Sequence, residues 1–295
     1  MTASPQHQEQ VEDAYAAREA ELEDGRMPFM EHLRELRKRL TVSVIAVFVG
    51  FLITYNFSSQ LFAIIVKPLN NVMVELAAQN SGLSPESLYF TKLHEPFWVF
   101  VSVGFWASLF LASPVVFYQL WKFVAPGLYK TERRFGVIFA LASGILFTSG
   151  AVFCYTQVLE PVFRFLLGYS TENIGEISSM LGGDYQVGKQ VGLQPMLTIG
   201  EYLAFAKRLL LGFGLIFELP LAILFLTFAG LVTHRSLWRF NRWFIVIAFV
   251  VGAMLTPPDI YSQALMAGPL IILYQISIGI SWLVTVSKER KQAKL

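Results

Sequence analysis

The chain has 295 residues, of which 55% are hydrophobic and only 15% are charged. An ordinary soluble domain carries about 25% charged residues, so this composition favours a protein that folds in a membrane. The formal net charge of +2 gives no polycationic character, and we expect no nucleic-acid partner. Cys154 is the only cysteine, and no histidine lies at metal-ligand spacing from it or from another histidine. We therefore expect no disulfide, metal or cofactor.

The N-terminal segment is acidic, with seven Asp or Glu residues and one Arg before Gly25. A secretory signal has a basic start and an apolar stretch, and a transit peptide is poor in acids, so this segment is neither. We predict a disordered acidic cytoplasmic tail over residues 1–27, with at most transient helix. Its acidity argues against an imported organelle protein. A short basic cytoplasmic tail is expected over residues 288–295.

Residues 28–287 are expected to form one all-α membrane domain. A membrane helix needs about 20 mostly apolar residues to cross the hydrocarbon core. Charged residues cut the chain into six apolar runs, which predict six transmembrane helices within residues 40–57, 95–122, 134–160, 208–234, 242–256 and 259–288. The fifth run has only 13 residues between Arg242 and Thr256, so the fifth helix is expected to be short.

The positions of Lys and Arg predict the orientation, because cytoplasmic loops are enriched in both. Seventeen of the 23 Lys and Arg residues lie in the two tails and in the loops after the second and fourth runs. The other six lie on the opposite side. This bias and the even number of spans predict that both termini are cytoplasmic. Two long loops, at residues 56–95 and 160–202, are then external.

Short external cap helices are expected in these two loops. The apolar stretch 62–66 is followed by Pro68, which is expected to end the first cap helix. The stretch 161–166 predicts a second one, and the Gly-rich residues 168–192 are expected to be flexible. Within the second span, Pro114 is expected to kink the helix or to end its straight part.

No catalytic motif is recognisable: the chain has no P-loop, no His-Glu-x-x-His and no Gly-x-Ser-x-Gly. We expect that the protein is not an enzyme and that its work draws on an ion gradient, such as the proton motive force, on binding energy or on a partner. Two other classes stay open at this point. A secondary transporter would have repeats and a midplane polar site, and a membrane-embedded enzyme would have clustered polar residues inside its spans.

Two charged segments are candidate binding sites on the cytoplasmic side. In residues 30–40, three Leu residues form one stripe of an amphipathic helix, and Glu35 stands among basic residues. In residues 121–134, aromatic residues lie beside charges, and Glu132 is again surrounded by basic residues. The alternative for both segments is an interfacial anchor that only fixes the topology.

Glu218 is the third candidate, because it lies ten residues into the fourth run. A carboxyl group at that depth is costly and usually functional. Gln275 lies at a similar depth in the sixth run and could be its hydrogen-bond partner. The alternative is a polar staple between two helices.

Four segments in this order resemble the TatC family of twin-arginine protein translocases. They are residues 32–40, 113–134, 213–220 and 251–263, and the likeness extends over roughly residues 28–287. The resemblance implies six membrane helices in the bacterial cytoplasmic (inner) membrane. It also implies a receptor that binds twin-arginine signal peptides of folded preproteins for transport across the membrane.

The resemblance also implies roles for individual residues. It assigns Glu35, Arg37, Phe123 and Glu132 to signal-peptide binding. It assigns the intramembrane polar position and the docking of small single-span partners, the TatA and TatB types, to Glu218, Thr256, Asp259 and Gln263. Pro68 is expected to shape the external cap, and self-association within membrane lipid is expected. The acidic tail and the loop around residues 170–195 are longer than is typical of the family.

Overall fold

The computed structural model describes residues 5–79, 88–124, 133–167, 197–256 and 260–292, and side chains from Met30 to Val286. The described residues form helices and no named strand. The elements are α1 (Pro5–Thr54), the 3₁₀ turn η1 (Tyr55–Phe57), α2 (Ser58–Gln79), α3 (Glu95–Val124), α4 (Arg133–Phe153), the π-helical turn η3 (Cys154–Val158), α7 (Ile199–Phe217), α8 (Leu219–Phe228), α9 (His234–Leu255) and α10 (Ile260–Gln292).

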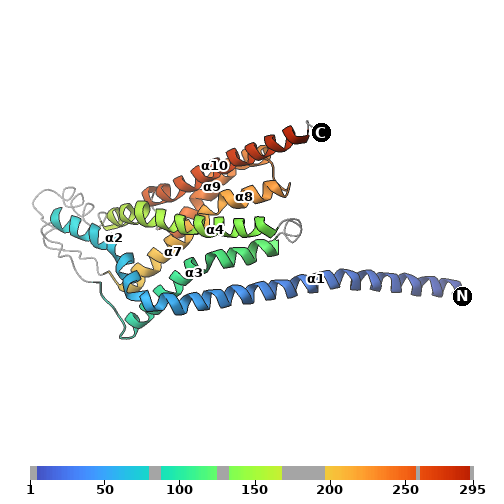
Figure 1. The fold of residues 1–295 in the computed structure, drawn as a ribbon, viewed down its shortest axis with the longest axis horizontal. Coiled ribbons are helices and arrows are strands. Elements are labelled where there is room, and N and C mark those ends of the chain that lie inside the picture. The colour runs from blue at the N-terminus through green and yellow to red at the C-terminus, as the bar shows by residue number, and fades with distance from the viewer. Residues whose placement is uncertain (1–4, 80–87, 125–132, 168–196, 257–259, 293–295) are drawn as a thin grey trace, which may run out of the picture.

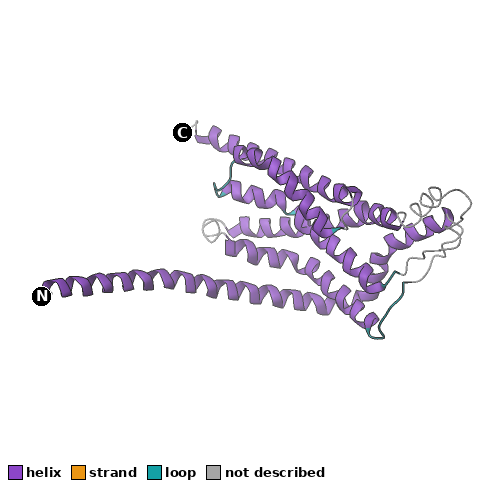
Figure 2. Cartoon of the chain, turned by 180° about the vertical axis from the view of Figure 1, so that it is seen from behind, coloured by secondary structure: helices purple, strands orange, loops and turns teal. Residues whose placement is uncertain are grey.

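Six stretches of the described residues are long and apolar enough to cross a membrane, which confirms the expected six spans. The N-terminal end of α1 and the C-terminal end of α10 lie at the same end of the bundle, which we call the terminal end (Figure 1). The opposite end carries α2 and is called the cap end. Figure 2 shows the same arrangement from behind.

α1 is a single helix of 50 residues that extends well beyond the bundle (Figure 1). It continues through residues 5–27, for which the sequence predicts a disordered tail. Ala, Glu, Gln and Arg dominate this stretch, and all four have high helix propensity. The apolar part of α1 packs on α3, where the hydroxyl of Thr54 donates to the carbonyl of Gly104 at 2.7 Å.

The fifth membrane helix is longer than its apolar run, so the expectation of a short helix is wrong. α9 has 22 residues and begins at His234, capped by the side chain of Thr233, which accepts from the backbone N–H of Ser236. At 1.5 Å per residue, 22 residues extend over about 33 Å. The first turns of α9 contain Arg235, Arg239 and Arg242. The helix tolerates them there, because a long basic side chain near a helix end can extend its charged group into water.

α2 forms the cap, and Pro68 lies inside it instead of ending it. Proline lacks an N–H, so the carbonyl of Ile64 loses its helical donor. The hydroxyl of Tyr155 donates to that carbonyl at 2.9 Å, and the hydroxyl of Tyr202 donates to the next one, of Ile65, at 2.5 Å. The helix continues past Pro68 because the hydroxyl of Tyr155 replaces the missing bond, and the hydroxyl of Tyr202 adds a bond at the next carbonyl.

We expect the double substitution Tyr155→Phe and Tyr202→Phe to destabilise the cap. The carbonyl of Ile64 is left without a donor, which costs about 1–3 kcal/mol, and the lost bond to Ile65 costs about 0.5–1.5 kcal/mol. The measurement is thermal unfolding of the purified chain, with protease sensitivity of residues 58–79 as a local readout. Tyr261→Phe is the matched control, because Tyr261 stacks on Phe165 and its hydroxyl has no hydrogen bond among the described residues. Equal stability of the double variant and the control would contradict this account of the cap.

The third span does not end in a separate second cap helix. After α4, the π-helical turn η3 leads into a helix that continues to Leu167, so residues 161–166 prolong the span. Two polar contacts fix it to α2: Asn71 donates to Glu160 at 2.8 Å, and Arg164 pairs with Glu75 at 2.6 Å. The cap and the third span therefore form one packed unit.

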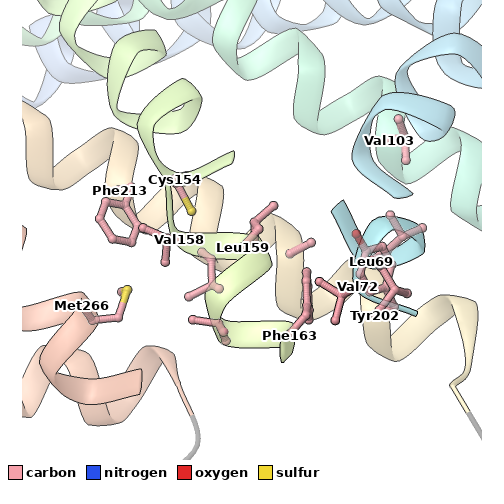
Figure 3. Packing of buried hydrophobic residues seen from close by; sticks show 14 of the residues in the cluster. Leu69, Val72, Val103, Cys154, Val158, Leu159, Phe163, Tyr202, Phe213 and Met266 are labelled. Carbon is pink, nitrogen blue, oxygen red and sulfur yellow. The ribbon is translucent and has the colours of Figure 1, made fainter. Parts of the chain in front are cut away.

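The main core lies where η3, α2, α7 and α10 meet (Figure 3). Cys154, Leu159, Phe213 and Met266 are fully buried there. The cysteine is a small buried apolar residue, as free cysteines often are. α4 and α7 approach closely, because a Cβ atom at Gly150 would lie 2.4 Å from the carbonyl oxygen of Phe213. Small residues at such crossings let membrane helices pack backbone to backbone.

Candidate functional site

The first candidate site lies at the terminal end, between α1 and α3. The guanidinium of Arg39 donates to Oε1 of Glu35 at 2.8 Å, one helical turn away. It also donates to the side-chain oxygen of Gln119, on α3, at 3.5 Å. Arg39 therefore fixes the position of the carboxylate relative to α3. The described residues give no hydrogen bond to the other oxygen of Glu35, Oε2, so it can accept from an incoming cation.

An aromatic stack lies beside this carboxylate. The rings of His32 and Phe123 are stacked with centroids 4.4 Å apart and an interplanar angle of 21°. His32 is on α1, one turn before Glu35, and Phe123 is in the last turn of α3. Lys122 lies over the ring of Tyr118 at 5.7 Å. The site thus combines one acid, an aromatic surface and several basic groups.

The electrostatics keep Glu35 ionised. The hydrogen bond from Arg39 holds the pKa of the Glu35 carboxyl below its usual value, and the nearby charges of Arg39, His32 and Lys122 act in the same direction. Glu35 precedes the apolar part of α1, and its side chain is 32% exposed. A half-exposed anion in this position can exchange partners with a second guanidinium.

The other expected residues of this site are placed as follows. Arg37 is exposed on α1, and its backbone carbonyl accepts from the hydroxyl of Thr41 at 2.8 Å. Glu132 lies outside the described residues. The structure therefore brings Glu35 and Phe123 together, and it adds His32, Arg39 and Gln119, which sequence reasoning did not single out.

The second candidate site is the buried carboxyl of Glu218, at the break between α7 and α8. Pro220 causes the break, because it occupies the first turn of α8 and has no N–H for the preceding turn of α7. Glu218 is 8% exposed, and neither of its carboxyl oxygens has a hydrogen-bond partner among the described residues. The hydroxyl of Ser143 and the backbone of Phe147 are the polar groups beside it.

Gln275 is not the partner of Glu218. Its side-chain amide donates to Asn241 of α9 at 2.9 Å instead. A similar depth in the sequence says nothing about which face of a helix a residue occupies. Ser143, on α4, accepts from the indole N–H of Trp121 at 2.9 Å, which leaves its own proton available to Glu218. No local sequence pattern predicts this arrangement.

We expect Glu218→Gln to be tolerated better than Glu218→Ala. A buried carboxyl group without a cation beside it is expected to be neutral, and an amide keeps hydrogen-bonding groups at Ser143. Alanine removes those groups and leaves a cavity, which we expect to lower stability by about 1–3 kcal/mol. The measurement is transport activity at matched protein levels. Equal loss in both variants, with normal expression, would show that ionisation of Glu218 matters.

The third candidate site is the face around the turn between α9 and α10. Thr256 is buried and donates to the carbonyl of Gly252 at 2.9 Å, so its hydroxyl caps α9. Gln263 is half-buried in the first turns of α10, and Asp259 lies outside the described residues. On α9, Gly252 approaches the backbone of Gln263, and Met254, two residues later, is 74% exposed. No cluster of three or more His, Cys, Asp or Glu residues that could hold a metal occurs in the described part of the chain.

These features define a helical membrane protein that crosses the bilayer six times and carries a charged, aromatic surface at its terminal end. Comparison with known proteins is consistent with this class. The family model for the Sec-independent protein translocase protein TatC matches residues 31–269. The chain belongs to the TatC family.

The relatives support this assignment over nearly the whole chain. The TatC protein of Desulforapulum autotrophicum is 40% identical over 87% of this chain and 84% of its own length. The TatC protein of Escherichia coli is 35% identical over 86% of this chain and 88% of its own length. A crystal structure of the twin-arginine translocase receptor TatC has a TM-score of 0.66 and 35% identity, and the match covers 86% of this chain and 99% of that one.

Membership of this family makes the chain a multi-pass membrane subunit of the Sec-independent protein translocase and not an enzyme. The two alternatives from the sequence, a solute transporter and a membrane-embedded enzyme, are thereby excluded.

Proposed function

We propose that this chain is the subunit that binds the twin-arginine signal peptides of folded preproteins, and that the site between α1 and α3 receives the two arginines. One observation carries the proposal: an ionised carboxylate, Glu35, is held in place beside the stacked rings of His32 and Phe123. Its second oxygen has no donor among the described residues. Glu132 is the proposed second carboxylate, from the loop that joins α3 and α4.

The chemistry of arginine fits this arrangement. A guanidinium is always charged, presents a planar fork to carboxylates and stacks on aromatic faces. Glu35 can accept the fork of one arginine if Arg39 moves or shares the carboxylate, and the His32–Phe123 stack offers a flat surface beside it. Lysine has the charge but not the planar fork, so a twin-lysine peptide should bind poorly.

The direct test compares a twin-arginine signal peptide with its twin-lysine variant as bait for the full chain in native membranes. The proposal is supported if only the twin-arginine peptide captures the chain, or if it captures at least tenfold more of the chain than the twin-lysine peptide does. Equal capture by both peptides would contradict it.

We further propose that small single-span subunits of the TatA and TatB types dock at the face around Met254 and Gln263. Met254 is highly exposed on α9, and polar Gln263 is half-buried at the start of α10, where its backbone lies against Gly252 of α9. Thr256 and Asp259 would contribute to the same face. A photocrosslinker at Met254 should capture a single-span protein, and capture of lipid alone would contradict this docking site.

The proposed location is the bacterial inner membrane, with the terminal end in the cytoplasm. Leu231, between α8 and α9, and Leu93, before α3, are 73% and 94% exposed, so cysteine at either position would be accessible. In a Cys154→Ala background, we expect Leu93→Cys to react with an impermeant thiol reagent in intact cells. Leu231→Cys should react only after the membrane is permeabilised. The reverse pattern would contradict the orientation.

A further inference from the structure

A groove of about 300 Å³ lies towards the cap end, between α2, α3, α4 and α7. Its walls are apolar except for Thr148, Tyr155, Lys207 and the indole N–H of Trp106. The hydroxyl of Thr148 donates to the carbonyl of Gly144 at 2.8 Å, and that of Tyr155 donates to the carbonyl of Ile64. Both hydroxyl protons are therefore used within the protein. Lys207 is the only charged lining residue, and the indole N–H of Trp106 is the other lining donor without a hydrogen bond in the described part of the chain.

Lys207 is half-buried on α7, and its ammonium donates to the hydroxyl of Ser102 on α3. Among the described residues, no carboxylate lies within ion-pair distance of it. An ammonium group has three N–H donors, so two remain after the bond to Ser102. A cation in an apolar groove with donors to spare selects an anion with several acceptor oxygens.

The depth of Lys207 fits the headgroup boundary of a bilayer. It lies eight residues after the start of α7, or about 12 Å along the helix axis. α7 and α8 together run over 30 residues, about the full thickness of a bilayer with its headgroups. Each headgroup layer is about 5–8 Å thick. The backbone of Lys207 then lies just inside the hydrocarbon, and its long side chain can reach the phosphate level.

We propose that the groove holds an anionic phospholipid of the leaflet at the cap end, with its phosphate on Lys207 and an acyl chain along the apolar walls. The walls carry Phe110, Val152 and Leu210, which can contact a hydrocarbon chain but cannot hydrogen-bond a peptide backbone. An extended polypeptide would leave its N–H and C=O groups unpaired there. This difference favours a lipid over a segment of a transported protein.

An anionic headgroup is favoured over a zwitterionic one. Arg208 follows Lys207 in the sequence and is exposed, so the region carries two positive charges. Phosphatidylglycerol offers a phosphate without a cation, whereas the choline group of phosphatidylcholine would add a third positive charge beside them. Charge-assisted hydrogen bonds from the ammonium should then give a preference of about tenfold for phosphatidylglycerol.

The experiment measures lipid retained by the purified full chain in mixed micelles of detergent with phosphatidylglycerol or phosphatidylcholine, by native mass spectrometry. We expect the wild type to retain about tenfold more phosphatidylglycerol. Lys207→Met should lower that retention to the phosphatidylcholine level, and Lys207→Arg should preserve it. Lys92→Met is the matched control, because Lys92 is exposed at the same end and does not line the groove.

A second variant tests the groove without changing the charge. Ala151 lines the groove, and Ala151→Phe should fill part of it and reduce the retention of both lipids, while size-exclusion profiles report that the chain is folded. Equal retention by Lys207→Met and the wild type would overturn the proposal. So would an equal loss in Lys92→Met, or a photocrosslinker at Val152 that captures a bound signal peptide instead of lipid.

Discussion

Replacing both Glu35 and Glu132 by alanine is expected to weaken the binding of a twin-arginine signal peptide by about a hundredfold. An exposed ion pair contributes about 0.2–1 kcal/mol, and a hydrogen bond to a charged group about 1.5–3 kcal/mol. The half-exposed site should fall between these limits, so that each carboxylate contributes about tenfold. Charge reversal to lysine should weaken binding further at either position, through direct repulsion.

The structure predicts that Glu35→Ala is the more harmful of the two single substitutions. It removes an acceptor and also leaves the guanidinium of Arg39 unpaired beside the incoming arginines. Glu31→Ala is the matched control, because Glu31 is an exposed acid one turn earlier on the same helix. The measurement is signal-peptide affinity in membranes with matched protein levels. Unchanged affinity in the double variant would refute the carboxylate site.

Gly150→Ala is expected to destabilise the bundle by about 3 kcal/mol or more. The added Cβ would lie 2.4 Å from the carbonyl oxygen of Phe213 and 2.9 Å from Cβ of Phe217, and the first of these atoms is backbone that cannot turn away. α4 and α7 would have to separate, and forced overpacking typically costs about 1–3 kcal/mol, occasionally more. We expect the midpoint of thermal unfolding to fall by roughly 6–12 °C.

Gly279→Ala provides the matched control for this substitution. Gly279 lies within α10, and a Cβ there would meet no atom within 4 Å. Alanine is favoured over glycine in a helix by about 0.8–1 kcal/mol, so this variant should be as stable as the wild type or slightly more so. Similar midpoints for the Gly150 and Gly279 variants would contradict the close approach of α4 and α7.

The six spans could be predicted from the sequence because charge is excluded from hydrocarbon, and the charged residues therefore mark where helices leave it. Element ends were predicted less well. α9 begins at His234, since basic side chains do not stop a helix that can reach the interface. α2 continues past Pro68, since the hydroxyl of Tyr155 satisfies the one carbonyl that proline leaves free and that of Tyr202 supports the next. The second outcome depends on tertiary contacts that no local pattern encodes.

The candidate binding site could be predicted only in part. The resemblance to the family pointed to Glu35 and Phe123, and the spacing of Glu35 and Arg39 is that of a helical ion pair. Gln119 lies 80 residues from Arg39 in the sequence, so their contact could not be foreseen. Trp121 and Ser143, beside Glu218, were missed because aromatic and hydroxyl residues are common in membrane helices.

A double-mutant cycle tests the central claim, that Glu35 binds a signal-peptide arginine, most directly. Affinity is measured for the wild type and Glu35→Gln, each with a twin-arginine peptide and with a peptide in which one arginine is replaced by glutamine. The account predicts that Glu35→Gln weakens binding about tenfold with the intact peptide. It should have little effect once the contacting arginine is gone, giving a coupling energy of about 1.4 kcal/mol for one of the two arginines. A coupling energy of zero for both arginines would contradict the account.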